Sequence, residues 1–328
     1  MSKRFIEVCS GCGGLSQGLM NVGWEPLLIN EIDKTCCLTL RENHPGVHVL
    51  QGSMTDLDAS IYRGGVDLLA GGVPCQAFSQ AGLRRGLEDE RGILILEFTR
   101  LIEECDPKVF LIENVKGLLT HNNGNTIRDV IEHLKMNGHY RVHYKVLNAY
   151  HYGVPQKRER VFIIGVREDI NNEWIYPEPI PENERKVLRD VLMDVPASIG
   201  YAYPPRKRQI MEMVPEGGCW VNLPEDIQIE YLGGAYTSGG GKRGMAKRLS
   251  MSEPSLTLTT SPCQKQTERC HPLETRPLTV REYARIQTFP DEFIFKGTMA
   301  QQYKQIGNAV PVKLAEVMGR QLINFLDL

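Results

Sequence analysis

The strongest constraint on the fold is a rhythm of short apolar runs that alternate with amphipathic segments through the first half of the chain. Runs with the length of buried strands occupy residues 5–8, 26–29, 66–70, 109–112, 144–147 and 161–166. Between some of these runs, apolar residues recur at helical spacing, in 94–102 and 127–134. Strands that alternate with helices form a mostly parallel sheet. The sequence therefore predicts a doubly wound α/β fold.

The character of the sequence changes after residue 172, where scattered prolines, glycine clusters and basic residues replace the apolar runs. A helical pattern returns at residue 277, and apolar residues between 314 and 325 fall on one helix face. We therefore expect residues 1–172 and 277–328 to form one domain. Residues 173–276 are expected to form a second, smaller domain of irregular structure.

Charge and cysteine content narrow the class of protein. The formal net charge is only −2, so contact with a nucleic acid would need lysines and arginines gathered on one face. The nine cysteines are odd in number and lack the spacing of disulfide or zinc sites. There is no apolar run of signal-peptide or membrane-span length. We expect reduced thiols, no metal, no membrane segment and a soluble protein of the cytoplasm.

A glycine-rich turn and a carboxylate predict a nucleotide-type site. Ser10-Gly11-Cys12-Gly13-Gly14 directly follows the first predicted strand, and the second ends at Asn30-Glu31. Glycines allow the backbone to approach a ligand, and a carboxylate at the end of the second strand can accept ribose hydroxyl protons. The spacing is not that of a pyrophosphate clamp. The alternatives are a simple tight turn and a solvated loop acid.

Cys75 is the candidate nucleophile. It lies in Gly71-Gly72-Val73-Pro74-Cys75-Gln76-Ala77-Phe78-Ser79, a loop shaped by glycine and proline that follows a predicted strand. Most cysteines are small buried apolar residues. A cysteine at the carboxyl edge of a parallel sheet, where ligands bind, is more typical of a nucleophile.

An acid and two arginines are predicted near the same edge. Glu113 ends an apolar strand, so it could face Cys75 and share a proton with a ring nitrogen. Arg158 and Arg160 are two residues apart, on the same side of an extended chain, and could hold a base carbonyl or phosphates. The alternatives are a surface acid at a strand end and an ordinary charged face.

Together, these segments resemble the cytosine-5 DNA methyltransferase family, which includes the single-chain modification enzymes of bacterial restriction systems. The matching segments are 10–14, 30–33, 72–76, 113–115, 156–160, 278–290 and 305–311. They occur in the family's order and span nearly the whole chain. The resemblance implies a Rossmann-like methyltransferase domain, a target-recognition domain in 173–276, S-adenosylmethionine as cofactor and double-stranded DNA as substrate.

The resemblance also implies a mechanism. Cys75 would add to carbon 6 of a flipped-out cytosine, Glu113 would pair with N3, and Arg160 would contact the base, with Arg158 beside it. Carbon 5 then takes the methyl group. Catalytic roles are therefore expected for Cys75, Glu113, Arg158 and Arg160.

The cofactor site implied by the resemblance departs from the family pattern at three positions. Cys9 replaces an aromatic residue that stacks on adenine, Ser53 replaces an aspartate near the adenine amino group, and Ile32 replaces the large residue that often follows the glutamate. Part of the expected adenine contact is therefore missing. The predicted cofactor-binding residues are Cys9, Gly11, Cys12, Gly13, Gly14, Glu31, Ile32, Ser53, Met54, Gly72, Pro74, Leu94, Asn308 and Ala309.

Basic residues concentrate in the expected recognition domain, where Thr257-Leu258 matches a Thr-Leu pair of the family. Loops with lysines and arginines suit the phosphates and the major groove, although solvated charge is the alternative for each. The predicted DNA-binding residues are Gln76, Ser79, Arg206, Lys207, Arg208, Lys242, Arg243, Lys247, Arg248, Thr257, Leu258 and Arg269.

Three other functions compete with DNA methylation. A nicotinamide-dependent oxidoreductase would explain the glycine turn and Glu31 but not the Cys75 loop. A binding protein with the family fold would have no use for both Cys75 and Glu113. Transfer-RNA methylation would use the same chemistry, but the branch that performs it has a reduced recognition region. We expect a monomer, with a cognate restriction endonuclease as a possible partner in the same system.

Overall fold

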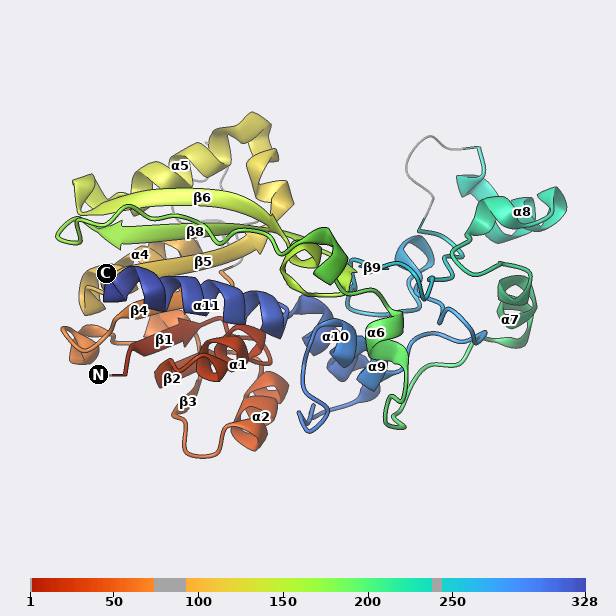
Figure 1. Ribbon diagram of the computed structural model, residues 1–328, viewed down its shortest axis with the longest axis horizontal. Helices are drawn as coiled ribbons and strands as arrows, with labels where there is room; N and C mark the ends of the chain where they lie inside the picture. Colours follow the sequence, from red (N-terminus) through yellow and green to blue (C-terminus); the bar gives the residue numbers. More distant parts are fainter. Residues whose placement is uncertain (1, 74–92, 238–243) are drawn as a thin grey trace. The chain divides into compact units, whose positions relative to one another are not determined.

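The computed structural model describes residues 2–73, 93–237 and 244–328. The chain forms two compact units, which Figure 1 shows. Unit 1 comprises Met1–Tyr152, Glu159–Ile180 and Ala309–Leu328. Unit 2 comprises Gly153–Arg158 and Pro181–Asn308. Each unit has its own hydrophobic core.

Unit 1 is built on a seven-stranded sheet (Figure 1). In spatial order the strands are β3 (Val49–Gln51), β2 (Glu25–Glu31), β1 (Arg4–Val8), β4 (Leu68–Gly71), β5 (Val109–Val115), β8 (Glu159–Arg167) and β6 (Tyr140–Asn148). Only β8 runs antiparallel to its neighbours β5 and β6. The predicted α/β fold with a mostly parallel sheet is confirmed, and each predicted strand is present. The sequence analysis missed β3, which is too short to show a pattern.

The order of the strands reverses direction between β1 and β4. From β1 the sheet continues through β2 to β3 on one side and through β4 to β5 on the other. Val8 pairs with Gly71, so the segments that leave these two strands start side by side. In open α/β sheets, ligands bind at the carboxyl edge at such a reversal point. The glycine turn after β1 and the segment leading to Cys75 both begin there.

Helices cover both faces of this sheet. They are α1 (Gly14–Asn21), α2 (Lys34–Asn43), α4 (Ile93–Cys105), α5 (Asn125–Leu134) and α11 (Val312–Asp327). Phe98 of α4 and Val130 of α5 share a buried core with Ile6 of β1. Alternate residues of a strand face opposite sides, so Glu7 points to the other face, where it contacts α1. The two ends of the chain meet in an ion pair of 2.6 Å between Lys3 and Asp327.

Short 3-10 turns complete unit 1. They are η1 (Met54–Asp56), η2 (Ser60–Tyr62), η3 (Lys116–Leu119), η4 (His121–Gly124), η5 (Met136–Gly138) and η6 (Ala149–Tyr152). Of these, η1 lies in the segment that follows β3 and carries two of the predicted cofactor-binding residues, Ser53 as its N-cap and Met54 as its first residue.

The buried carboxyl of Glu7 makes stability depend on pH. Burial raises the pKa of Glu7 to about 8, while the hydroxyl of Ser16 donates a hydrogen bond to it. Because the pKa of Glu7 is higher in the folded state than in the unfolded state, its contribution to stability is fully present below the unfolded pKa. This contribution is lost as the pH rises through about 8. Between about pH 5 and 8, the free energy of unfolding of the wild type should fall by roughly 1 kcal/mol per pH unit because of Glu7. We expect the Glu7→Gln variant, whose side chain is neutral at every pH, not to show this fall.

Chemical denaturation at several pH values checks this prediction. The matched control is Glu25→Gln, because Glu25 lies at the exposed start of β2. The wild type and the Glu25→Gln variant should lose stability in parallel across this pH range. A Glu7→Gln variant with the same pH slope as the wild type would contradict the assignment.

Unit 2 has little regular structure, as expected for the middle of the chain. Its helices are α6 (Arg189–Leu192), α7 (Pro205–Glu212), α8 (Glu225–Leu232), α9 (Val280–Ile286) and α10 (Met299–Asn308), with 3-10 turns η7 (Glu182–Glu184), η8 (Trp220–Asn222), η9 (Gly233–Ala235) and η10 (Lys265–Thr267). The strands β7 (Gln156–Lys157) and β9 (Ser255–Leu256) pair in parallel. A core around Ile210, Met211 and Leu232 packs α7 and α8 together.

By packing, residues 277–308 belong to unit 2, although they follow the basic region in sequence. Tyr303 of α10 donates a hydrogen bond to the carbonyl of Leu278, and its ring contacts Tyr283 of α9. The functional division expected from the sequence, with 277–328 assigned to the catalytic domain, stays a prediction, because packing does not define a functional domain.

The described ranges hold no disulfide, no metal-ion cluster and no helix suited to span a membrane. The eight cysteines there are all free thiols. No group of three or more His, Cys, Asp and Glu side chains in these ranges is arranged to hold a metal ion. None of the helices described combines the length and the apolar character needed to cross a bilayer.

Candidate active site and cofactor-binding edge

The glycine turn after β1, residues 9–14, has a left-handed backbone conformation that residues other than glycine rarely adopt. Cys9, Gly11 and Gly13 all have positive φ, of 52°, 56° and 88°. A β-carbon on Gly14 would lie 2.2 Å from the carbonyl oxygen of Val310, so only glycine fits there. At Gly11, by contrast, an added β-carbon would meet no atom within 4 Å. The turn is therefore tightly packed behind Gly14 and open at Gly11.

Glu31 ends β2 beside this turn. Its carboxylate accepts hydrogen bonds from the backbone N–H of Gly11, at 2.6 Å, and of Asp33, at 2.8 Å. These two bonds fix the carboxylate at the carboxyl edge of the sheet. Each carboxylate oxygen keeps capacity for a further hydrogen bond. The open turn and the fixed carboxylate fit a ligand with a ribose, such as S-adenosylmethionine.

The segment after β3 lies next to Glu31. It contains Ser53, one of the three departures from the family pattern, and Met54, another predicted cofactor-binding residue. The N–H of Gly52 donates to the carbonyl of Glu31 at 3.0 Å, which brings Ser53 and Met54 to the same edge. The Ser53 hydroxyl accepts a hydrogen bond from the Thr55 hydroxyl at 2.7 Å. Met54 is buried, with its sulfur 3.5 Å from that of Cys9. Cys9 and Ser53, two of the three positions that depart from the family pattern, thus lie in adjoining segments.

Ile32 differs from the other predicted cofactor-binding residues in its exposure. Its side chain is 69% exposed, directly after the buried Glu31. An isoleucine this exposed presents an apolar surface at the edge of the predicted site. Leu94, on α4, is half-buried against the core of that face.

The thiols of the glycine turn are poor nucleophiles. Burial raises the pKa of Cys9 to about 12, and the nearby charges of Glu31 and Glu7 add to this effect. Burial also raises the pKa of Cys12. Both thiols are therefore protonated at neutral pH, and the thiolate is the reactive form. Neither competes with Cys75 for the role of nucleophile.

Gly72 connects the glycine turn with the predicted catalytic acid. A β-carbon on Gly72 would lie 3.6 Å from the carbonyl oxygen of Cys9 and 3.7 Å from Oε2 of Glu113. The segment that leads to Cys75 therefore starts between the cofactor-binding edge and the Glu113 carboxylate. Pro74, Cys75, Gln76 and Ser79 themselves lie outside the described residues.

Glu113 and Arg160 form an ion pair at this edge. Nε of Arg160 is 2.8 Å from Oε1 of Glu113, and their side chains are only 13% and 11% exposed. The pair spans two strands, since β5 and β8 are antiparallel and Arg160 is opposite Val115. A guanidinium held this close fixes the orientation of the carboxylate. The structure thus brings together two of the predicted catalytic residues.

Asn114 is a residue of this site that the sequence analysis did not single out. Its Oδ1 accepts a hydrogen bond from the N–H of Val115 at 2.9 Å, and its Nδ2 donates to the carbonyl of Val73 at 2.7 Å. The side chain therefore ties the end of β5 to the residue just before the Cys75 segment. Its place between Glu113 and Val115 in a matching motif was the available signal.

Arg158 has quite different partners from Arg160. It is 1% exposed, and its guanidinium donates to the carbonyls of Leu258, at 3.1 Å, and Gly307, at 3.0 Å. All three residues belong to unit 2. The expectation that both arginines face a base rested on strand alternation. In the structure Arg158 instead braces two distant segments of unit 2.

Other segments that resemble the family contact each other next to Arg158. Gln156 accepts a hydrogen bond from the N–H of Leu258 at 2.9 Å and donates one to Gln287 at 2.7 Å. Thr257, next to Leu258, donates from its hydroxyl to the carbonyl of Lys157 at 2.8 Å. The predicted DNA-binding pair Thr257 and Leu258 is therefore held by the 156–158 segment.

The last two predicted cofactor residues fall at the junction of the units in sequence. Asn308 ends α10 in unit 2, and its carbonyl lies 3.5 Å from Nη2 of Arg158. Ala309 begins the final segment of unit 1, where a β-carbon on Gly14 would be 3.2 Å from its own. Ala309 thus packs directly behind the glycine turn.

Most described basic residues of the predicted DNA-binding set are paired with acids or carbonyls. On α7, Arg206 pairs with Glu230, and Arg208 with Glu212 at 3.1 Å. Lys207 pairs at 2.6 Å with Glu268, which is buried. Lys247 donates to the carbonyl of Gly217. Lys242 and Arg243 lie outside the described residues.

Two further arginines of that set are buried. Arg248 donates to the carbonyls of Val214 and Met211, and Arg269 to the carbonyl of Thr257 at 2.7 Å. Burial lowers the pKa of Arg269. These guanidinium groups brace loops from within unit 2 and do not form an exposed basic face.

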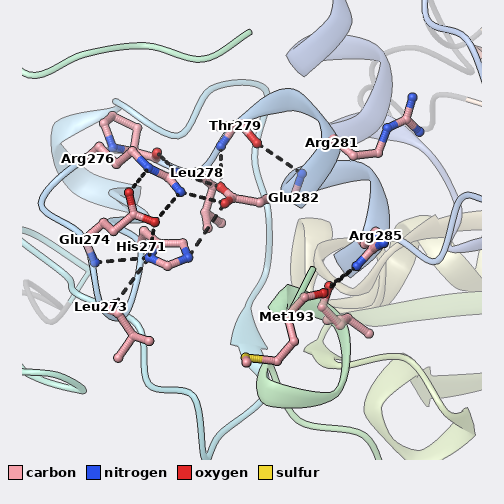
Figure 2. Close-up of polar contacts among 12 residues, drawn as sticks. Met193, His271, Leu273, Glu274, Arg276, Leu278, Thr279, Arg281, Glu282 and Arg285 are labelled. Carbon is pink, nitrogen blue, oxygen red and sulfur yellow. Dashed lines mark hydrogen bonds and ion pairs between the residues drawn. The ribbon is translucent and has the colours of Figure 1, made fainter. Parts of the chain in front are cut away.

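Figure 2 shows a neighbouring cluster in unit 2 that secures the start of α9. Arg276 forms ion pairs of 2.9 Å with Glu274 and 2.8 Å with Glu282. Glu282 also accepts from the N–H of Thr279, whose hydroxyl accepts from the N–H of Glu282 in return. This reciprocal cap satisfies the first turn of the helix. The cluster joins the end of the basic region to α9.

Comparison with known proteins identifies the family. The family model described as C-5 cytosine-specific DNA methylase matches residues 3–324. The Type II methyltransferase M.Eco47II of Escherichia coli is 51% identical over 329 residues, covering 98% of this chain and 79% of that protein. M.Sau96I, a Type II methyltransferase of Staphylococcus aureus, is 49% identical over 328 residues, with coverages of 98% and 76%.

Solved structures share the fold over their full length. A prophage-encoded protein of Escherichia coli, described as a DNA modification methyltransferase, aligns with a TM-score of 0.74 and 26% identity, covering 100% of both chains. The Dnmt2 methyltransferase of S. pombe has the same fold, with a TM-score of 0.73 and 19% identity over 99% of this chain and 100% of that one. The chain therefore belongs to the C-5 cytosine-specific DNA methylase family.

Proposed function

We propose that this protein transfers a methyl group from S-adenosylmethionine to carbon 5 of a cytosine within a short duplex DNA sequence, as the modification enzyme of a restriction system. The family and the Type II methyltransferases among the relatives support the reaction. One observation carries the assignment of the site. A β-carbon on Gly72 would lie within contact distance of both the Cys9 carbonyl of the glycine turn and the Glu113 carboxylate, so we place methyl donor and acceptor chemistry at one edge.

Cys75 and Glu113 activate the base in this proposal. Carbon 5 of cytosine is a weak nucleophile, and adding the Cys75 thiolate to carbon 6 moves the electron pair of the 5,6 double bond to carbon 5. Glu113 shares a proton with N3 and so stabilises the charge that develops on the ring. S-adenosylmethionine supplies the methyl group on a positively charged sulfur. Loss of the carbon 5 proton and release of the Cys75 thiolate complete the reaction.

Arg160 holds the Glu113 carboxylate in position in this proposal and contacts the base. The target base must leave the duplex to reach these residues, at a cost of a few kcal/mol. Unit 2 is proposed to bind the DNA, with the paired cations of α7 exchanging their acidic partners for phosphates. We propose that the enzyme acts as a monomer, and that a cognate endonuclease cuts the same sequence.

The cofactor is proposed to sit at the carboxyl edge of β1 and β2. Glu31 would accept the ribose hydroxyl protons, and the open backbone at Gly11 would allow a close approach. Met54, buried against Cys9, would line the adenine side. These residues would hold the cofactor at the edge of the sheet where Glu113 also lies, and the cofactor would supply the methyl group.

Replacing Ser53 by aspartate is expected to tighten cofactor binding. Ser53 stands where the resemblance places a carboxylate near the adenine amino group, and a hydrogen bond to a charged acceptor is stronger than one to a hydroxyl. We expect the dissociation constant for S-adenosylmethionine to fall about threefold to tenfold, as one such bond would produce. Calorimetry checks this result. An unchanged or larger dissociation constant would count against this position of the adenine.

Bisulfite sequencing of plasmid DNA from cells that express the protein tests the proposed function. Protected cytosines at one position of one recurring short sequence are the expected result, and they report the activity and the target together. Bisulfite sequencing of the same cells' transfer RNA is the comparison. Methylation that appears only in the RNA, or in neither nucleic acid, would overturn the proposal.

A further inference from the structure

Arg100, on α4, donates hydrogen bonds to backbone carbonyls of the 53–57 turn, which contains the predicted adenine-side residues Ser53 and Met54. Its Nη2 donates to the carbonyls of Met54, at 3.0 Å, and Thr55, at 3.5 Å, and its Nη1 donates to the carbonyl of Leu57, at 3.0 Å. One guanidinium thus binds three carbonyls within four residues. This arrangement needs a planar group with several donors in fixed directions.

Two acids hold Arg100 in this position. Glu97 lies 2.7 Å from Nε, and Glu104 lies 2.5 Å from Nη1. Glu104 also accepts a hydrogen bond from the N–H of Ala59 at 2.8 Å, so it binds the same segment directly. The whole stretch from Met54 to Ala59 is therefore fastened to one helix by two neighbouring side chains.

The opposite end of the turn is fastened to the cofactor-binding edge. The N–H of Gly52 bonds to the carbonyl of Glu31, and the side-chain amide of Asn30 donates to the carbonyl of Gly52 at 3.0 Å. Between these two anchors stand Ser53 and Met54. Their positions relative to Glu31 are therefore set from both sides, by β2 and by Arg100.

We propose that Arg100 is a positioning residue for the adenine side of the cofactor site. It fixes the 53–57 turn next to the segment that carries Glu31. The inference rests on the proposed function for the location of the cofactor. Because Ser53 lacks a carboxylate, the turn can recognise adenine only through a short hydroxyl and its backbone, and both depend on where the turn is held.

The test compares Arg100→Lys with Arg63→Ala. Lysine keeps the charge but cannot donate to three carbonyls at once. Arg63 is an exposed arginine that donates to the carbonyls of Glu103 and Glu104 near the end of the same helix, so it is a matched control. Binding is measured for S-adenosylhomocysteine and for S-inosylhomocysteine, which lacks the amino group of adenine. Steady-state kinetics with S-adenosylmethionine complete the set.

We expect Arg100→Lys to weaken S-adenosylhomocysteine binding about tenfold, the effect of losing one or two charge-assisted hydrogen bonds. Binding of the inosyl analogue should change about twofold or less, because it lacks the group that the turn recognises. The KM for S-adenosylmethionine should rise while kcat at saturation stays within about twofold, since the lost interaction is one of binding. Arg63→Ala should match the wild type.

A general loss of structure would weaken both ligands equally and lower kcat, and that result would overturn the inference. Equal affinities in Arg100→Lys and wild type would overturn it as well. If Arg100→Lys does not fold, Glu104→Gln tests the same point, because it keeps an acceptor for Ala59 but removes the charge beside Arg100. A wild-type protein that binds neither ligand would instead contradict the proposed function.

A double-mutant cycle links this inference to Ser53. The tightening expected from Ser53→Asp requires the turn to be held in place, so it should largely vanish in the Arg100→Lys background. Full tightening in both backgrounds would show that Arg100 does not position Ser53, and would overturn the proposal independently of the single variants.

Discussion

The Cys75→Ala variant should have no measurable methyl transfer, with a loss of at least about a thousandfold, as expected when an enzyme's nucleophile is removed. Without the thiolate, nothing moves electron density to carbon 5 of cytosine. Specific DNA binding should survive, because the sulfur contributes to the reaction and not to the grip on the duplex. Transfer of a radiolabelled methyl group, together with a gel-shift titration of the same preparation, measures both properties.

The matched control is Cys263→Ala. Cys263 is a half-buried thiol whose pKa is raised by burial to about 11, so it is protonated at neutral pH and should be dispensable for the chemistry. Appreciable methylation by the Cys75→Ala variant would overturn the assignment of the nucleophile.

A mechanism-based substrate gives the same prediction a second readout. In DNA containing 5-fluorocytosine, fluorine cannot leave as the proton does, so the wild-type protein should remain covalently bound to the base. The complex should withstand denaturing electrophoresis and should be absent for Cys75→Ala. A wild-type protein that methylates cytosine but forms no such complex would contradict the proposed route.

The second large effect is expected for Glu113→Gln. Glutamine has the same shape but cannot share a proton with N3, so kcat should fall by about a hundredfold to ten-thousandfold, the range for loss of a general acid or base. Affinity for DNA and for S-adenosylmethionine should change little. Single-turnover kinetics with saturating DNA and cofactor isolate the chemical step.

The neighbouring ion pair offers a matched control for Glu113→Gln. Glu159 of β8 pairs at 2.9 Å with Lys116, which directly follows β5, but about half of each side chain is exposed. Glu159→Gln should therefore leave kcat nearly unchanged. Equal losses in the two variants would mean that Glu113 matters only for the stability of the strand pair.

Much of the fold could be predicted because its signals are local. A buried strand shows its apolar run within a few residues, and the glycine turn shows its positive-φ positions directly in the sequence. The three-residue strand β3 was missed, because so short a segment carries no periodicity. The antiparallel course of β8 was equally invisible, since pairing direction depends on where the connecting segment runs.

Residue type and position identified several members of the candidate site, but the contact partners of other residues could not be predicted from the sequence. Glu113 and Arg160 were both singled out from their residue types and positions. Arg100 and Arg158 bind carbonyl oxygens, which every residue possesses, so no partner residue marks them in the sequence. The basic residues of α7 show the same difficulty, because their acidic partners Glu230 and Glu268 are distant in the chain.

The amide of Asn114 has a consequence for how such an enzyme can diversify. Strand β5 carries the acid at position 113, and its next residue holds the carbonyl of Val73, where the Cys75 segment begins. The spacing between the acid's strand and Val73 is thus fixed at the sheet, by a hydrogen bond of 2.7 Å. Sequence drift among the loops that choose the target site would leave that spacing untouched, so new specificities can arise on an unchanged reaction centre.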